Sequence, residues 1–307
     1  MDVAIIGTGA IGGYYGAKLA RAGHRVCFLA RSDYQRLVDH GIAVESVAGD
    51  FDLPPQAFTV RRDPADLPAC DLVCLTAKAT ANDDLLALLG PALKPGATIL
   101  AMQNGFGVEE RLAGLYPQAH VCAGLCFVCV TRPSPGHIRH TAYGTVSLAP
   151  LDPGDAPLVE DLARVLTAAG LEAPVLGDVL TARLRKLVWN IPFNGLSVVL
   201  EATTGDLLAS PPARRLLTAL MGEVLAAARA CGVVIEEAFI PQMLAVTESM
   251  ASYDPSMRLD HLAGRPMEID AIYRQVMALA RAHGFDMALA GQLADQLEHI
   301  QNRPPAR

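Results

Sequence analysis

The sequence lacks the features that would assign it to a membrane-bound, secreted or nucleic-acid-binding class. No apolar run among its 307 residues is long enough to cross a bilayer. Its first residues form a candidate core strand that contains Asp2, and they do not resemble a cationic signal segment. Basic residues are not in excess either, because the net charge is −7, which would repel the phosphates of nucleic acids. We therefore expect a cytoplasmic protein that binds neither nucleic acid nor membranes.

The cysteines indicate neither disulfides nor a metal. There are seven, an odd number, and most lie in apolar strand-like runs, which favours buried reduced thiols. Cys122, Cys126 and Cys129 lie close together in the sequence, but they belong to a predicted strand that would point Cys126 and Cys129 to opposite faces. We expect no metal site there.

The pattern of elements predicts two domains. Apolar residues make up 51% and charged residues 19%, which is ordinary for a globular protein of this length. Strand-like runs alternate with helical stretches up to Leu176, and only helical periodicity follows. The sequence therefore predicts an α/β domain with a doubly wound parallel sheet of the Rossmann type over residues 1–177, and an all-α domain over 178–307.

The expected strands of the first domain are Val3–Ile6, Arg25–Ala30, Asp71–Thr76, Ala97–Ala101, His120–Val130, Gly144–Ala149 and an edge strand Leu171–Leu176. Its expected helices are Ile11–Ala22, Asn82–Leu89, Glu109–Leu115 and Ala156–Ala169. The expected helices of the second domain are Val179–Ala202, Pro212–Cys231, Glu236–Ala251 and Pro266–His283, with Pro266 in the first turn and Gly284 as the stop.

A glycine-rich turn near the N-terminus is the first functional signal. Gly7-Thr8-Gly9-Ala10-Ile11-Gly12 stands between a buried strand and a helix, and a second strand follows. Gly7 would permit the tight turn, Gly9 would let a pyrophosphate approach the backbone, and Gly12 would let the helix pack closely on the strand. The spacing and context predict dinucleotide binding, and the alternative is a purely structural turn.

The end of the second strand bears on which dinucleotide is bound. An NAD site commonly places an acid about 20 residues after the glycines, for the ribose 2′-hydroxyl. Here the strand ends at Arg31, and Asp33 comes two residues later. A guanidinium suits the 2′-phosphate of NADP, so we favour NADPH. The alternative is that Arg31 is only a solvated strand end.

A polar stripe lies on the first helix of the second domain. Lys186, Asn190 and Asn194 are spaced by four residues and would share one helix face. Pro192 should bend the helix there because it has no N–H to donate. Neighbouring positions are apolar, and buried polar groups need partners, which a bound polar substrate would supply. An interdomain hydrogen-bond network would serve equally well, and the stripe alone does not choose between them.

Several motifs together resemble the ketopantoate reductases (2-dehydropantoate 2-reductases). They are the glycine turn, T-A-K around Lys78, Q-N-G around Asn104, the Lys186-Asn190-Asn194 stripe and the C-terminal S-M…M-E-I-D segment. The resemblance runs nearly end to end. It implies NADPH-dependent reduction of 2-dehydropantoate to (R)-pantoate, in the route to pantothenate and coenzyme A. It also implies a helical domain like the C-terminal one of 6-phosphogluconate dehydrogenases.

By this resemblance, Lys186 is the catalytic lysine that protonates the keto oxygen. An ammonium can both stabilise the developing charge and deliver the proton. Glu268 matches an acid that bonds the substrate hydroxyl and supports catalysis, although a carboxylate also suits a helix start. Lys78 and Asn104 would border the nicotinamide and the substrate.

The remaining matched residues concern substrate binding and contain two departures. Asn190 and Asn194 match substrate-binding amides, and Ser256 matches a residue that holds the substrate. Many members have Asn-Pro-Leu-Thr where this chain has Asn194-Gly195-Leu196-Ser197, and often Asn-Gly-Glu-Leu where it has Thr204-Gly205-Asp206-Leu207. Because the second Asn also touches substrate, these changes leave open another branched or hydroxylated 2-keto acid.

Two further questions stay open at the level of sequence. A non-catalytic NADP(H)-sensing module would keep the glycine turn, but the intact stripe and Glu268 argue against it. A homodimer is possible, because an apolar face of the second helical element could line a core or a dimer contact. We favour the core for this face, which consists of Leu216, Leu217, Leu220, Met221, Val224 and Leu225.

Overall fold

The computed structural model describes residues 1–303, and residues 304–307 of the predicted second domain lie outside the described part. Two compact units are present. The first comprises residues 1–103 and 108–179, and the second comprises residues 104–107 together with the chain from Leu180 on. The short segment Asn104–Gly107 therefore groups with the second unit, an assignment that a single boundary near Gly177-Asp178 does not express.

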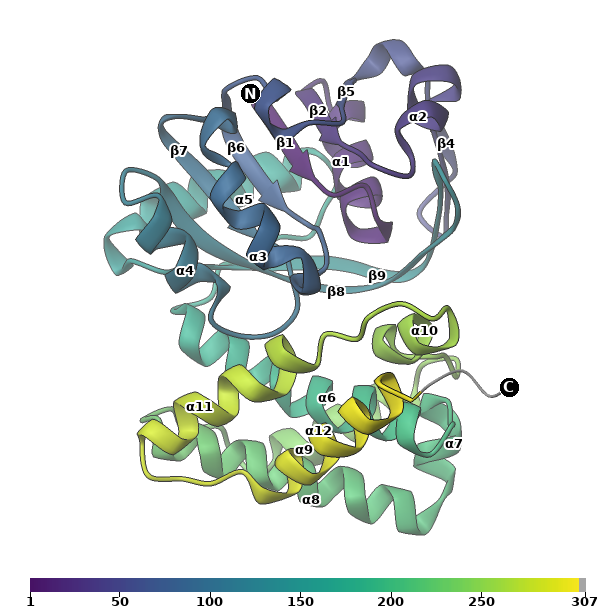
Figure 1. Ribbon diagram of the computed structural model, residues 1–307, viewed down its shortest axis with the longest axis vertical. Helices are drawn as coiled ribbons and strands as arrows, with labels where there is room; N and C mark the ends of the chain where they lie inside the picture. Colours follow the sequence, from purple (N-terminus) through teal and green to yellow (C-terminus); the bar gives the residue numbers. More distant parts are fainter. Residues whose placement is uncertain (304–307) are drawn as a thin grey trace. The chain divides into compact units, whose positions relative to one another are not determined.

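The first unit contains one sheet within the described residues, in the strand order β4-β3-β9-β8-β7-β6-β1-β2-β5 (Figure 1). Its strands are β1 Asp2–Ile6, β2 Arg25–Leu29, β3 Ile42–Ser46, β4 Phe51–Leu53, β5 Thr59–Arg61, β6 Cys70–Leu75, β7 Leu93–Ala101, β8 His120–Ser134 and β9 His137–Pro150. Its α-helices are α1 Ala10–Arg21, α2 Tyr34–His40, α3 Asn82–Leu85, α4 Val108–Leu115 and α5 Ala156–Ala168.

The sheet is covered on both faces at β1. Val3 and Ile5 of β1 belong to one apolar cluster, whereas Ala4 and Ile6 belong to another. Because successive side chains of a strand point to opposite faces, a strand buried on both faces is apolar at every position. The run that identified β1 in the sequence is thus explained, and the predicted doubly wound sheet is confirmed.

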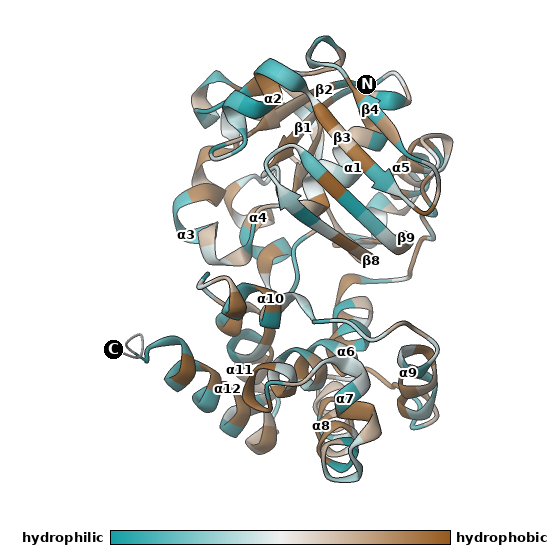
Figure 2. Cartoon of the chain, turned by 90° about the vertical axis from the view of Figure 1, so that its right-hand side faces the viewer, coloured by the Kyte–Doolittle hydropathy of each residue, from teal (hydrophilic) through white to brown (hydrophobic). Residues whose placement is uncertain are grey.

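The sheet is mixed at one edge, which the sequence did not predict. β8 pairs with β9 in antiparallel fashion, and β3 with β4 likewise, while the other pairs are parallel. Figure 2 shows hydrophilic and hydrophobic residues alternating along β9, as expected for a strand with one exposed face.

Two predicted elements of the first unit differ from the structure. The helix expected over Asn82–Leu89 is a short α3 followed by a 3₁₀ turn, Leu86–Leu88. The edge strand expected over Leu171–Leu176 is reduced to one bridge between Leu148 and Val175, because Pro174 has no N–H for a continuous ladder. The strands β3, β4 and β5 were not predicted.

The second unit is helical. Its elements are α6 Val179–Val199, α7 Thr204–Ala209, α8 Pro211–Ala230, α9 Phe239–Glu248, α10 Ser256–Leu262, the π-helical stretch Asp270–Arg274, α11 Gln275–Ala282 and α12 Ala288–Gln301. The predicted helices α6, α8 and α9 are confirmed within a few residues, whereas α7, α10 and α12 were not predicted. Gly284 has a φ of 80° after α11, which confirms the predicted stop.

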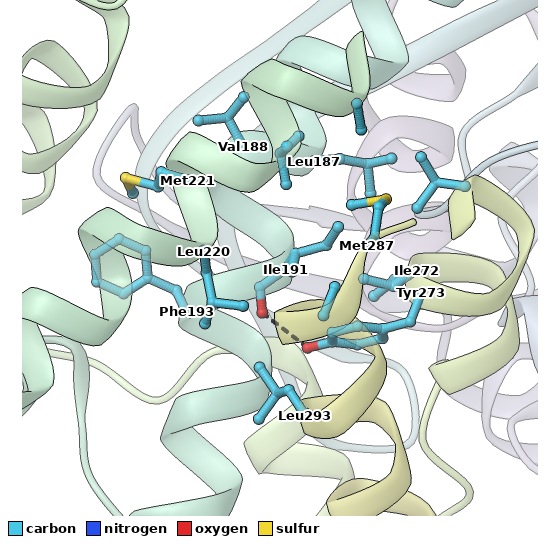
Figure 3. Packing of buried hydrophobic residues seen from close by; sticks show 14 of the residues in the cluster. Leu187, Val188, Ile191, Phe193, Leu220, Met221, Ile272, Tyr273, Met287 and Leu293 are labelled. Atoms are coloured by element: carbon cyan, nitrogen blue, oxygen red, sulfur yellow. Dashed lines mark hydrogen bonds between the residues drawn. The ribbon is translucent and has the colours of Figure 1, made fainter. Parts of the chain in front are cut away.

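The core of this unit forms around α6 and the helix that follows Glu268 (Figure 3). Its labelled members include Ile191, Leu220 and Tyr273. The apolar face predicted to be core on α8 is buried except for Leu216, which is 47% exposed. Within residues 1–303, no helix is both long and apolar enough to span a membrane.

The predicted start of the last of these helices was wrong. Pro266 does not lie in a first turn, because helical residues begin at Ile269. The backbone N–H of Met267 donates to Oε1 of Gln301 on α12 at 2.7 Å, which holds this segment out of the helix. Glu268 therefore stands immediately before the helix, where its carbonyl accepts from the N–H of Ile272 at 3.1 Å.

Candidate active site

The glycine turn of the first unit has the geometry that its sequence predicts. Gly7 has a φ of 107°, and a Cβ there would come within 2.8 Å of the backbone of Ala77. A Cβ on Gly12 would lie 2.0 Å from the carbonyl oxygen of Gly7 and 2.5 Å from Oγ1 of Thr76. That hydroxyl donates to the Gly7 carbonyl at 2.7 Å. Both positions therefore require glycine for close approach of backbone segments.

The N-terminus of α1 leaves room for a phosphate. Gly9 is the N-cap residue, it is exposed, and a Cβ there would meet no protein atom within 4 Å. No side chain caps this end, and the first turn contains no acidic residue. Thr8, Ala10 and Ile11 surround it and are half-buried. Exposed backbone N–H groups at a helix N-terminus favour an anion, so the turn fits the pyrophosphate of a dinucleotide.

After β2, the two candidate ligands of the ribose, Arg31 and Asp33, differ in exposure. Arg31 is exposed, whereas Asp33 is only 2% exposed. The carboxylate of Asp33 accepts hydrogen bonds from Nη1 of Arg132 and, at 3.2 Å, from the N–H of Gly136. The carboxylate of Asp33 is thus bonded to the hairpin of β8 and β9 and does not point to a ribose hydroxyl. Arg31 remains at the position expected for a 2′-phosphate contact.

Lys78 lies beside the glycine turn. It follows Ala77, which packs on Gly7, and its carbonyl accepts from the N–H of Ala81 at 3.0 Å. Gln103, two residues after β7, fixes this segment, because its Nε2 donates to the Ala77 carbonyl at 2.7 Å and to Oδ1 of Asn82 at 2.8 Å. This anchoring role of Gln103 was not predicted, since its partners are distant in sequence.

The second unit joins three predicted residues in one hydrogen-bonded chain. Nζ of Lys186 donates to Oδ1 of Asn104 at 3.0 Å, and Nδ2 of Asn104 donates to Oε2 of Glu268 at 3.4 Å. The segment Asn104–Gly107 is docked by the N–H of Phe106, which donates to the carbonyl of Ala271 at 2.9 Å. A lysine, an amide and a carboxylate from three distant segments thus converge.

Asn190 lies one helical turn beyond Lys186 and is only 5% exposed. Its Nδ2 has no hydrogen-bond partner among residues 1–303. A buried amide group without a partner costs free energy, on the order of 1–3 kcal/mol. Such a donor, four residues after Lys186 on the same helix face, indicates a place for a polar ligand.

Asn194, the third residue of the stripe, is already partly engaged. Its Oδ1 accepts from the N–H of Met257 at 3.2 Å and from Oγ of Ser256 at 3.5 Å. It therefore holds the first turn of α10 against α6 and positions Ser256. The structure brings these two predicted residues together, and a helix-capping amide is a sufficient local reason.

Both departures from the family pattern have structural counterparts. A Cβ on Gly195 would lie 2.4 Å from Oη of Tyr273, which donates to the carbonyl of Ile191 at 2.8 Å (Figure 3). A larger residue would collide with that hydroxyl.

The second departure, Thr204, is bonded to the backbone. Its Oγ1 donates to the carbonyl of Tyr253 at 3.3 Å and accepts from the N–H of Tyr253 at 3.1 Å. Thr204 is 1% exposed, so its hydroxyl links the start of α7 to the segment at Tyr253 and is not available to a ligand.

The cysteines form no cluster with other ligating groups. Among residues 1–303, no group of three or more His, Cys, Asp or Glu side chains could hold a metal ion. Burial raises the pKa of the Cys122 thiol far above its usual range.

Two family models and a close relative in sequence identify the family. The family model "Ketopantoate reductase PanE/ApbA" matches residues 3–153, and its C-terminal counterpart matches residues 178–301. A 2-dehydropantoate 2-reductase from Nostoc sp. is 41% identical over 305 residues, covering 98% of this chain and 95% of that protein.

Solved structures extend the likeness. A 2-dehydropantoate 2-reductase from Geobacter metallireducens superposes with a TM-score of 0.93 at 38% identity, covering 97% of this chain and 99% of that one. A dimeric ketopantoate reductase from Staphylococcus aureus superposes with a TM-score of 0.81, covering 98% and 99%, and its 18% identity shows a shared fold.

Proposed function

The chain belongs to the ketopantoate reductase family, and on this premise we propose that it reduces 2-dehydropantoate to (R)-pantoate with NADPH. The reaction is a step in the formation of pantothenate and coenzyme A. NADPH supplies the hydride when it is bound. Apart from membership of the family, the observation that supports the proposal is the hydrogen-bonded series Lys186–Asn104–Glu268.

Lys186 is the proposed proton donor to the keto oxygen. An ammonium has three N–H donors, and the bond to Asn104 fixes the direction of the side chain without consuming its charge. A positioned cation stabilises the oxyanion that forms as the carbonyl is reduced, and then transfers its proton. A single such donor is worth about 3–4 kcal/mol of transition-state stabilisation.

Glu268 is the proposed acceptor for the substrate hydroxyl. It is 4% exposed and is held next to Lys186 by the shared Asn104. We propose that Glu268 orients the substrate through this hydroxyl.

Asn190, Asn194 and Ser256 are the proposed substrate contacts. The unpartnered Nδ2 of Asn190 supports a hydrogen bond to the substrate. The side-chain oxygen of Asn194 already accepts a hydrogen bond from α10, so a contact with the substrate would use its side-chain nitrogen, Nδ2. Ser256 is proposed to hold the substrate through the hydroxyl that Asn194 positions.

For the cofactor, we propose that Gly7 to Gly12 hold the pyrophosphate, that Arg31 binds the 2′-phosphate, and that Lys78 and Asn104 border the nicotinamide. The open N-terminus of α1 supports the first assignment. The engagement of Asp33 with Arg132 supports NADPH over NADH, because the acid that would bind a ribose hydroxyl is withdrawn.

A second candidate substrate is another branched or hydroxylated 2-keto acid. The observation that favours it is Thr204, whose hydroxyl is taken up by the backbone of Tyr253. This chain thus lacks the side-chain contact to substrate that an Asn at this position is expected to provide. The chemistry of Lys186 and Glu268 would be the same for either substrate.

The test is NADPH oxidation by the purified protein with 2-dehydropantoate, beside a panel of other 2-keto acids and with NADH in parallel. Fast turnover selective for 2-dehydropantoate and NADPH is expected. Efficient reduction of a different keto acid would favour the second candidate. Tight NADPH binding without any turnover would instead support a sensing module and refute the enzymatic proposal.

Assembly and location are proposed separately. A homodimer is proposed from the likeness to the dimeric Staphylococcus aureus protein, and light scattering of the purified chain tests it. A cytoplasmic location is proposed from the seven cysteines, none of which forms a disulfide among residues 1–303.

A further inference from the structure

A second arginine stands next to the turn that carries Arg31. The edge strand β5 runs parallel to β2, and the N–H of Ala30 donates to the carbonyl of Arg61 at 2.9 Å. The chain leaving β5 therefore runs beside the chain leaving β2. In sheets of this type, ligands bind outside the carboxyl ends of the strands. Arg62, the residue after β5, is exposed at that edge.

Tyr34 links this arginine to the β2 turn. Its N–H donates to the carbonyl of Arg31 at 3.4 Å, which closes the turn after the strand. The Cζ atom of Arg62 lies 4.8 Å from the centre of the Tyr34 ring. Stacking on an aromatic face restrains a guanidinium while its N–H groups, which lie in the guanidinium plane, still point outward.

The neighbouring charged groups are otherwise engaged. The Asp33 carboxylate is buried and bonded to Arg132. Nη1 of Arg61 donates to the carbonyl of Val60 at 2.9 Å, and an Asp63 oxygen accepts from the N–H of Ala65 at 2.9 Å. Within residues 1–303, neither Arg31 nor Arg62 forms a salt bridge. Two cations thus lie at one sheet edge. Asp33, the acid nearest to Arg31 in sequence, is paired with Arg132, and Asp63, next to Arg62, bonds a backbone N–H.

We propose that Arg62 is a second ligand of the 2′-phosphate of NADPH, beside Arg31, and that Tyr34 positions it. This inference rests on the proposed NADPH-dependent function and adds a specificity-determining residue to it. A phosphate monoester carries close to two negative charges, so two guanidinium groups match it better than one. NADH lacks this phosphate and gains nothing from Arg62.

The experiment is calorimetric titration of the full chain and of R62A with NADPH and NADH, and with the fragments 2′,5′-ADP and 5′-AMP. R62A is expected to weaken NADPH and 2′,5′-ADP about tenfold, and to change NADH and 5′-AMP by less than about twofold. The matched control is R164A, which removes an exposed arginine of α5 that pairs with Asp161. It should leave all four affinities unchanged.

Variants of Tyr34 separate positioning from binding. Y34F keeps the ring and should keep NADPH affinity, whereas Y34A should weaken NADPH about threefold with little effect on NADH. Circular dichroism would establish that each variant is folded.

Two kinds of failure are distinguishable. Wild-type protein that binds no NADPH would refute the proposed function itself. Wild-type protein that binds NADPH tightly, with R62A either unchanged or equally weakened for NADPH and NADH, would overturn only the role of Arg62.

Discussion

Replacing Gly195 by alanine tests the packing that distinguishes this chain from family members with proline at that position. The new Cβ would lie 2.4 Å from Oη of Tyr273 and 2.5 Å from Cδ2 of Leu293. Ordinary van der Waals contact begins near 3.4 Å, so both neighbours must move by about 1 Å. Gly195 lies next to Asn194 on α6, so a shift there also disturbs the Lys186-Asn190-Asn194 stripe.

The expected loss of stability follows from three contributions. Overpacking of a dense core costs about 1–3 kcal/mol. Displacing the Tyr273 hydroxyl removes its bond to the Ile191 carbonyl, worth about 1 kcal/mol. Alanine offsets about 1 kcal/mol of this, because glycine is a poor helix former. We therefore expect G195A to lower the free energy of unfolding by about 1–3 kcal/mol.

Urea unfolding followed by circular dichroism measures this difference, with G222A as the matched control. Gly222 lies on α8, and a Cβ there meets nothing within 4 Å, so G222A should be neutral or stabilising by up to about 1 kcal/mol. In a Tyr273→Phe background the effect of G195A should shrink, because one of the two collisions is gone. G195A as stable as G222A would refute the packing argument.

Three further predictions follow from the same structure. Asn190→Leu removes a buried amide whose nitrogen has no partner, so the free energy of unfolding should stay the same or rise by up to about 1 kcal/mol. The KM for the keto acid should rise about tenfold, because a substrate contact is lost. An unchanged KM would contradict that contact. The hydrogen bond from Lys94 lowers the pKa of Asp71, so its stabilising share is present above pH about 4 and is lost as the pH falls through the lowered value. Asp71→Asn should therefore flatten the fall in urea midpoint between pH 5 and pH 3, and a parallel profile would count against the ion pair. Burial raises the pKa of the Cys70 thiol to about 12, so a disulfide reagent at pH 8 should leave Cys70 of the native protein unlabelled. Labelling should be slow and confined to the half-buried cysteines. Those cysteines are Cys126, Cys129 and Cys231.

The elements that were predicted well are those whose signals are local. β1, α1 and β2 lie within about one residue of their predicted bounds, because an apolar run, a glycine turn and a Gly23 stop occur together. The short strands β3 to β5 were not predicted, since three to five residues in a half-exposed edge carry little periodicity. Pro266 was misplaced because the bond from Met267 to Gln301 joins residues 34 positions apart.

For the site, the sequence predicted the stripe on α6, but not its partners. The i, i+4 spacing placed Lys186 and Asn190 on one helix face, whereas the bond from Lys186 to Asn104 spans 82 positions and was not predicted. The family resemblance implied only that both residues border the substrate. The engagement of Asp33 by Arg132, 99 positions away, could not be predicted from spacing. The roles of these residues remain predictions until variants are measured.

The most direct test of the account is the turnover of Lys186→Met with NADPH and 2-dehydropantoate. This variant keeps the length of the side chain and removes its proton and charge. The matched control is Arg185→Met, which removes a charge from an exposed neighbour stacked 4.3 Å above the Phe239 ring. We predict that Lys186→Met lowers kcat by about 10²- to 10⁴-fold with NADPH affinity nearly unchanged, while Arg185→Met retains activity. A kcat for Lys186→Met within a few-fold of the wild-type value would contradict the assignment of Lys186 as proton donor.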